Sequence, residues 1–137
     1  MRKVAILAVM LMLAVSMAVA QNTKTEAAQK NAESWLGLVD NGDYAGSYDR
    51  ASSTFKAALT KDKWVDTSKA VRSPLGKLVS RTLQNAQYTT QLPGAPDGQY
   101  VVVQYQSSFE NKKVAVETVI LQLEKDGQWK VSGYFIK

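Results

Sequence analysis

The chain has 137 residues, neither cysteine nor histidine, and a formal net charge of +5. Without those two residue types it can form no disulfide, none of the usual zinc sites, and no Ser-His or Cys-His nucleophile pair. Its 17 basic residues are interspersed with 12 acidic ones, a pattern that favours a solvated surface over a nucleic-acid-binding stripe. No nucleotide-binding glycine motif occurs. We therefore expect no metal, no cofactor and no nucleic-acid partner.

Residues 1–20 have the composition of a cleavable secretory signal peptide. Arg2 and Lys3 form a positive start, Val4 to Val15 form an apolar segment, and Ala18-Val19-Ala20 supplies the small residues that a signal peptidase accepts. The apolar stretch falls short of the roughly 20 residues that a spanning helix needs, and the missing cysteine excludes a lipoprotein anchor. We expect cleavage after Ala20, with no membrane span left. The product would be one periplasmic or secreted domain, residues 21–137.

Helical patterns fill the first half of this domain. Thr23 followed by Glu26 fits the capping box of a helix N-terminus, and Asn41-Gly42 predicts a left-handed C-terminal stop. Between them lies an apolar stripe at helical spacing, made of Ala28, Ala32, Trp35, Leu36 and Val39.

A second stripe runs over residues 44–59, where Gly46 and the Ser52-Ser53-Thr54 run weaken the helix or divide it in two. A third, short helix is expected to start after Thr60 as its cap. Pro74 should close it by disfavouring helical geometry at Ser73.

From Leu75 onward apolar and polar residues alternate as in β-strands. We place these strands at Lys77–Tyr88, Gln99–Glu110, Lys113–Leu123 and Gln128–Ile136. Asn111-Lys112 and Asp126-Gly127 predict tight turns, and residues 92–98, with two prolines, predict a rigid loop. Helices followed by such strands predict an α+β domain, with the N-terminal helices packed on a curved four-stranded antiparallel meander sheet.

Glu117 lies in the most apolar predicted strand, where an unpaired carboxylate would cost several kcal/mol. Arg81, in the first strand, is the candidate partner across the sheet. A structural ion pair is the simpler interpretation, and an acidic catalyst at Glu117 is the alternative, because perturbed pairs occur in both roles.

Aromatic residues recur at positions that a core demands, so packing is favoured over ligand contact. Val101, Val103, Tyr105 and Phe109 alternate on one strand face. On the last strand, simple alternation directs Trp129, Val131 and Phe135 to one side and Lys130, Ser132, Tyr134 and Ile136 to the other. Gly133 is a candidate for a bulge or for close approach of another backbone.

Several sequence blocks resemble a family of exported bacterial proteins catalogued as domain of unknown function 4019. They are Arg72-Ser-Pro-Leu-Gly76 with Ser80-Arg81, Leu92-Pro-Gly-Ala-Pro-Asp-Gly-Gln-Tyr100, Glu117-Thr118, and Asp126-Gly-Gln-Trp129 continuing to Tyr134. The resemblance implies a Gram-negative envelope protein without an assigned activity. The order of elements also looks like the cystatin-like or NTF2-like folds, in which a bent sheet wraps a helix and can leave a cavity.

These observations favour a binding or interaction module without catalytic chemistry, whose partner is a small molecule or an envelope protein. The polar residues expected to meet a ligand are Arg72, Arg81, Tyr105, Glu117 and Tyr134. An alternative is a homodimer or partner complex formed through an apolar patch on the outer sheet face, made of Val114, Val116, Ile120 and Ile136. A third, less favoured alternative is an enzyme that uses Glu117 as general acid or base, with Tyr134.

Overall fold

The structure, a computed structural model, describes the backbone of residues 2–137 and the side chains of residues 17–137. Within this range the helices are α1 (Arg2–Asp40), α2 (Tyr44–Asp49), α3 (Ser53–Ala58), α4 (Lys61–Arg72) and the 3-10 helix η1 (Ser73–Leu75). The strands are β1 (Leu78–Thr89), β2 (Tyr100–Phe109), β3 (Lys112–Leu123) and β4 (Trp129–Ile136). They form one antiparallel sheet in the order β1-β2-β3-β4, as the sequence predicts.

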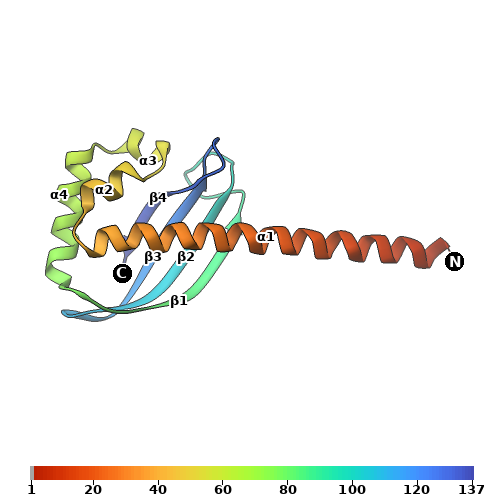
Figure 1. Cartoon of the computed structure of the whole chain (residues 1–137), viewed down its shortest axis with the longest axis horizontal. Helices are drawn as coiled ribbons and strands as arrows, with labels where there is room; N and C mark the ends of the chain where they lie inside the picture. The colour runs from red at the N-terminus through yellow and green to blue at the C-terminus, as the bar shows by residue number, and fades with distance from the viewer. Residues whose placement is uncertain (1) are drawn as a thin grey trace.

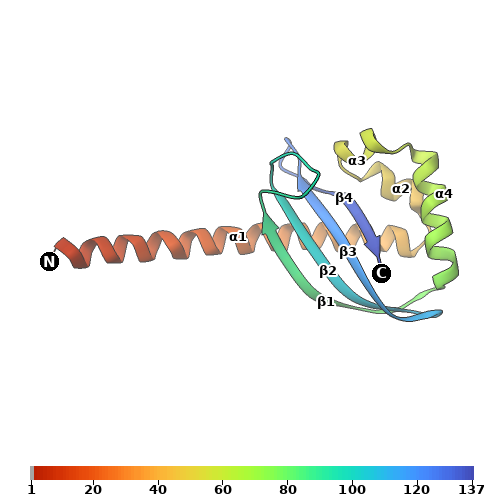
Figure 2. The ribbon, with the colours of Figure 1, turned by 180° about the vertical axis from the view of Figure 1, so that it is seen from behind.

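The helices lie on one side of this sheet, which confirms the predicted α+β class. Helix α1 crosses the concave face, and α2, α3 and α4 gather beyond the β4 edge (Figure 1). Seen from behind, the other face carries no helix (Figure 2). Among the described residues, no helix is both long and apolar enough to cross a membrane. Most of the predicted signal peptide, residues 1–16, lies outside the residues whose side chains are described.

Helix α1 ends where the sequence predicts, but the capping-box prediction at Thr23 is wrong. Thr23 lies inside α1, and its hydroxyl donates to the Val19 carbonyl at 3.0 Å. At the other end, Gly42 has φ 77° and the amide of Asp43 donates to the Leu38 carbonyl at 2.9 Å. This is a Schellman motif, and it fixes Asp40 in the last turn of α1.

The predicted division of the second helical segment is confirmed, since α2 and α3 are separate helices. Ser52 caps α3 through Phe55 N at 3.1 Å, and Thr60 caps α4 through Lys63 N at 3.3 Å. The prediction for Ser73 is wrong in one respect. This residue keeps right-handed helical geometry, because the chain continues past Arg72 into a 3-10 turn that accommodates Pro74.

The strands and turns lie within two residues of their predicted places. Gly127 has φ 82° in the predicted β3–β4 turn, and the Asp126 carboxylate accepts from Gln128 N at 2.9 Å. The β2–β3 turn is formed by Glu110-Asn111 rather than Asn111-Lys112, because Phe109 already pairs with Lys112.

A bulge in β4 overturns the simple alternation predicted for that strand. Ile120 pairs with Gly133 and Leu121 with Val131, so Ser132 is an extra residue and the facing of the strand reverses after it. Trp129 and Val131 face the helices as predicted. Beyond the bulge it is Tyr134 and Ile136 that face inward, opposite Val119 and Glu117, while Phe135 is 56% exposed. The predicted outer patch therefore loses Ile136.

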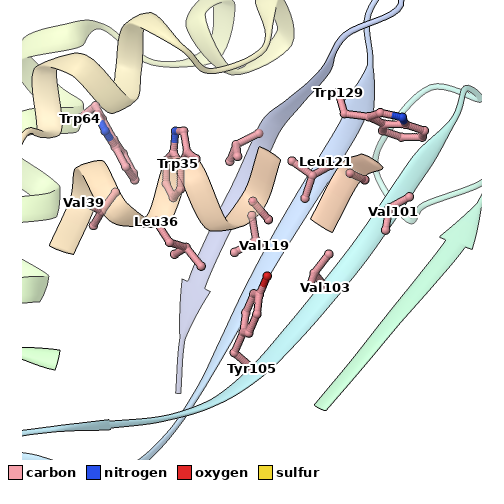
Figure 3. Close-up of a cluster of buried hydrophobic side chains, with 13 residues drawn as sticks. Trp35, Leu36, Val39, Trp64, Val101, Val103, Tyr105, Val119, Leu121 and Trp129 are labelled. Atoms are coloured by element: carbon pink, nitrogen blue, oxygen red, sulfur yellow. The ribbon is translucent and has the colours of Figure 1, made fainter. Parts of the chain in front are cut away.

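The interior between α1 and the sheet is filled by side chains. Trp35 and Leu36 of α1, Trp64 of α4, and inward residues of β2, β3 and β4 form one core cluster (Figure 3). The Trp35 and Trp64 indoles donate to the backbone carbonyl and hydroxyl of Ser47, each at 2.9 Å. Trp35, Trp64 and Trp129 all belong to this core, as predicted, and Trp64 also lines the cavity described below.

Candidate functional site

Arg81 and Glu117 form the ion pair that the sequence predicts. They lie on the inner face of β1 and β3, on either side of β2. Arg81 Nε and Nη2 donate to the two carboxylate oxygens of Glu117 at 2.7 and 3.1 Å. Such a two-point contact fixes both side chains more firmly than a single bond would.

The Glu117 carboxylate is fully buried and surrounded by donors. In addition to Arg81, Ser107 Oγ donates to its Oε1 at 2.5 Å and the Tyr134 hydroxyl donates to its Oε2. Each carboxylate oxygen therefore receives two hydrogen bonds, which compensates for the loss of water around a buried charge.

Asp40 completes the network, and sequence reasoning missed it. It accepts from Arg81 Nη1 and Nη2 at 2.8 and 2.9 Å, and from Arg72 Nη2 at 2.9 Å. One signal was available: Asp40 follows Leu36 by four residues, so the apolar stripe of α1 ends in a carboxylate. An acidic residue there is also unfavourable to the helix dipole, which suggests that it has a cationic partner.

Arg72, in the last turn of α4, links this network to the cavity described below. Its side chain is 5% exposed, its guanidinium carbon lies 4.9 Å from the Phe109 ring centroid, and Nη1 lies 3.4 Å from the Tyr134 hydroxyl. Its Nε is buried without a hydrogen-bond partner. The charged quartet (Asp40, Arg72, Arg81 and Glu117) thus contains two positive and two negative groups.

The network shifts the pKa values of Asp40 and Arg81 in the directions that ion pairing requires. Burial opposes the charge of Asp40, but hydrogen bonds and charge from Arg81 and Arg72 outweigh it and lower its pKa. Burial likewise opposes the charge of Arg81, yet its bonds to Asp40 and Glu117 raise its pKa. Burial, followed by the nearby Glu117 charge, raises the pKa of the Tyr134 phenol, which therefore stays protonated.

Acid should weaken this network through Asp40. Because the folded-state pKa of Asp40 lies below its ordinary value of 3.8, its contribution to stability is complete above that value and is lost as the pH falls through the folded pKa. We expect the free energy of unfolding to fall more steeply below about pH 3.8 in the natural protein than in Asp40→Asn. Urea unfolding at a series of pH values measures this, and equal slopes would contradict it.

Tyr105 belongs to the core rather than to the network. It lies on β2, with its ring centroid 6.0 Å from the Arg81 guanidinium carbon and its hydroxyl buried without a partner. Burial, and then the charge of Glu33, raise its pKa to about 12. The ring packs among apolar side chains (Figure 3).

A cavity of about 590 Å³ opens beside the quartet, between α4 and the end of β4. Its walls come from α4, one residue of β3, and the C-terminal residues, and they comprise Trp64, Thr67, Ser68, Val71, Arg72, Thr118, Tyr134, Phe135, Ile136 and Lys137. Of the five predicted ligand residues, Arg72 and Tyr134 line it. Arg81, Tyr105 and Glu117 do not.

Two buried polar groups in this wall have no partner within the protein, namely Arg72 Nε and Ser68 Oγ. Ser68 is 5% exposed. The sequence places Ser68 on a helical stripe but gives no sign that this residue lines a cavity. Both atoms have less than 1 Å² of accessible surface, so they are enclosed behind the wall and do not border the cavity.

The arrangement, with helices on one face of a curved antiparallel sheet, is that of an NTF2-like fold. The structure is similar to a putative ketosteroid isomerase from Shewanella frigidimarina NCIMB 400, with a TM-score of 0.53 and 17% identity over 81% of this chain and 94% of that one. At this identity the likeness concerns the fold. No curated protein matches the sequence. The family described as "Protein of unknown function (DUF4019)" matches residues 31–134, and the chain belongs to this family.

Proposed function

We propose that this chain is an exported, single-domain protein that binds a small and largely apolar molecule in the cavity between α4 and β4. The observation that carries the proposal is the cavity itself, about 590 Å³ in volume, whose wall combines apolar side chains with a few polar ones such as Arg72 and Tyr134. Pockets of this size with few polar groups are typical of small-molecule sites. The leader-like residues 1–20 support export.

The geometry of Glu117 supports binding over catalysis by this residue. Its carboxylate is fully buried, its two oxygens already accept four hydrogen bonds, and it is not among the cavity-lining residues. A general acid or base must reach the proton that it transfers, directly or through one water. Tyr134 lines the cavity, but its hydroxyl is already engaged as the donor of a hydrogen bond to Glu117.

The test compares two tryptophan substitutions on α4. Val71 lines the cavity, whereas its exposed neighbour Ala70 does not. Nile red, an uncharged apolar dye, should bind the natural protein and Ala70→Trp, and its affinity should fall at least about ten-fold in Val71→Trp, because the indole fills the cavity. Fluorescence titration measures this, and unfolding curves verify that both variants fold. Equal dye binding by the two variants would contradict the proposed site.

A further inference from the structure

The cavity between α4 and β4 runs along the edge of the last strand. Tyr134, Phe135, Ile136 and Lys137 all line it. Successive residues of a strand point their side chains to opposite faces of the sheet. A cavity that meets four residues in a row must therefore follow the edge of the strand rather than one of its faces. Strand β4 is the last in the order β1-β2-β3-β4, and its other edge is paired with β3.

Two residues of β4 direct their backbone groups to this open edge. The backbone groups of Val116 and Lys137 bond to each other in both directions, each at 3.0 Å. In an antiparallel ladder such pairs alternate with pairs that exchange no hydrogen bond. Ile136 and Tyr134 lie one and three residues before Lys137 in the same regular part of the ladder, so their N–H and C=O groups point away from β3.

These four backbone groups have no backbone partner among the residues that the structure describes. The same edge is already paired once, nearer the start of β4. There Ala51 forms a parallel bridge with Val131, and Ser52 N donates to the Val131 carbonyl at 2.8 Å. Beside Tyr134 and Ile136 the chain supplies no such neighbour and leaves the cavity instead. An open edge of this kind is a template for an added strand.

Apolar side chains flank the open edge on both sides. Val71 and Trp64 of α4 line the cavity on one side, and Phe135 lines it on the other. Val71 is 46% exposed and Phe135 is 56% exposed. A strand added beside β4 would direct alternate side chains toward α4 and toward Phe135. Both directions offer an apolar surface, so the pattern that fits is a run of successive apolar residues.

We propose that the ligand of this cavity is an extended peptide segment with successive apolar side chains, which adds to the sheet as a further strand beside β4. The inference rests on the proposed function, because it names the chemical class of what binds in the same cavity. Backbone hydrogen bonds to Tyr134 and Ile136 hold the segment, and the apolar walls select its side chains.

The experiment compares the peptide acetyl-Ser-Val-Leu-Val-Ser-amide with a form that is N-methylated at its three central residues. The methylated form keeps the side chains and loses those amide donors. Calorimetric titration of the full chain should give a dissociation constant at least about ten-fold lower for the unmethylated peptide, since lost hydrogen bonds weaken binding.

Hydrogen exchange followed by NMR locates the bound peptide. The amides of Tyr134 and Ile136 should exchange at least about ten-fold more slowly when the unmethylated peptide is bound, because they gain a partner. The amide of Phe135, which faces β3, is the internal control and should change little.

A proline on the edge tests the same contact from the side of the protein. Ile136→Pro removes one edge N–H, and proline is tolerated on an edge strand where its nitrogen faces away from the sheet. Ile136→Ala loses the same side chain but keeps the N–H, so it is the matched control. Peptide affinity should be at least about ten-fold lower in the proline variant than in the alanine variant, whereas Nile red should bind both alike.

Equal affinity for the two peptides, or Tyr134 and Ile136 amides left unprotected in the complex, would overturn the inference. Amides that are protected in the free protein and lose this protection on dilution would mean that a second copy of the chain occupies the edge, and would also overturn it. If Nile red binds but neither peptide does, the ligand class is wrong and the proposed function stands. If Nile red and both peptides fail to bind, the proposed function itself is wrong.

Discussion

Replacing Glu117 by alanine should lower the free energy of unfolding by about 3–5 kcal/mol, the usual cost of removing one partner from a buried ion pair. The loss is large because three groups depend on this carboxylate. Arg81 would keep only Asp40, and the hydroxyls of Ser107 and Tyr134 would lose their acceptor. Since natural domains are stable by about 5–15 kcal/mol, the variant should be close to unfolding.

Urea unfolding measures this change through the midpoint at constant slope. Glu117→Gln keeps an acceptor oxygen but loses the charge, so its destabilisation should be intermediate. Glu26→Ala, at an exposed position on α1, is the control and should stay within about 0.5 kcal/mol of the natural protein. A Glu117→Ala variant as stable as the control would show that the network contributes little to the fold.

Trp35→Ala should also cost about 3–5 kcal/mol, by a different mechanism. The indole is 3% exposed and lies at the centre of the helical layer, with its ring centroid 5.9 Å from that of Trp64 and 5.3 Å from that of Tyr134. Its removal leaves a cavity and deprives the Ser47 carbonyl of its indole donor.

Trp35→Phe fills part of that space without restoring the hydrogen bond, so it should lie between alanine and the natural residue. Thermal and urea unfolding measure both variants, with the exposed Lys30→Ala on the same helix as control. Equal stability of Trp35→Ala and Lys30→Ala would refute the assignment of Trp35 to the core.

The features that the sequence predicted are those that depend on local pattern. Strand positions follow from period-two alternation and turn residues such as Asp126-Gly127. The Arg81–Glu117 pair could be predicted because burying an unpaired carboxylate costs free energy, so Glu117 in the most apolar strand must have a partner.

The features that were missed depend on long-range geometry. Asp40 is distant in sequence from Arg72 and Arg81, and their meeting depends on how α1 crosses the sheet. The cavity arises where α4 and β4 diverge, so no run of residues encodes it. Simple alternation assigns Tyr134 to the wrong face because it takes no account of the bulge at Ser132, although the neighbouring Gly133 indicates one.

That bulge makes the side chain that meets Glu117 depend on the pairing register of the last strand. If Ser132 paired with Ile120 in a regular ladder, Tyr134 would lie opposite Thr118 and face outward, and Phe135 would lie opposite Glu117. Deletion of Ser132 would close the bulge and keep Val131 opposite Leu121, Gly133 opposite Ile120 and Tyr134 opposite Val119, so the phenol would stay in place. The bulge is thus the place in the last strand where one residue can be lost without changing which side chain meets Glu117.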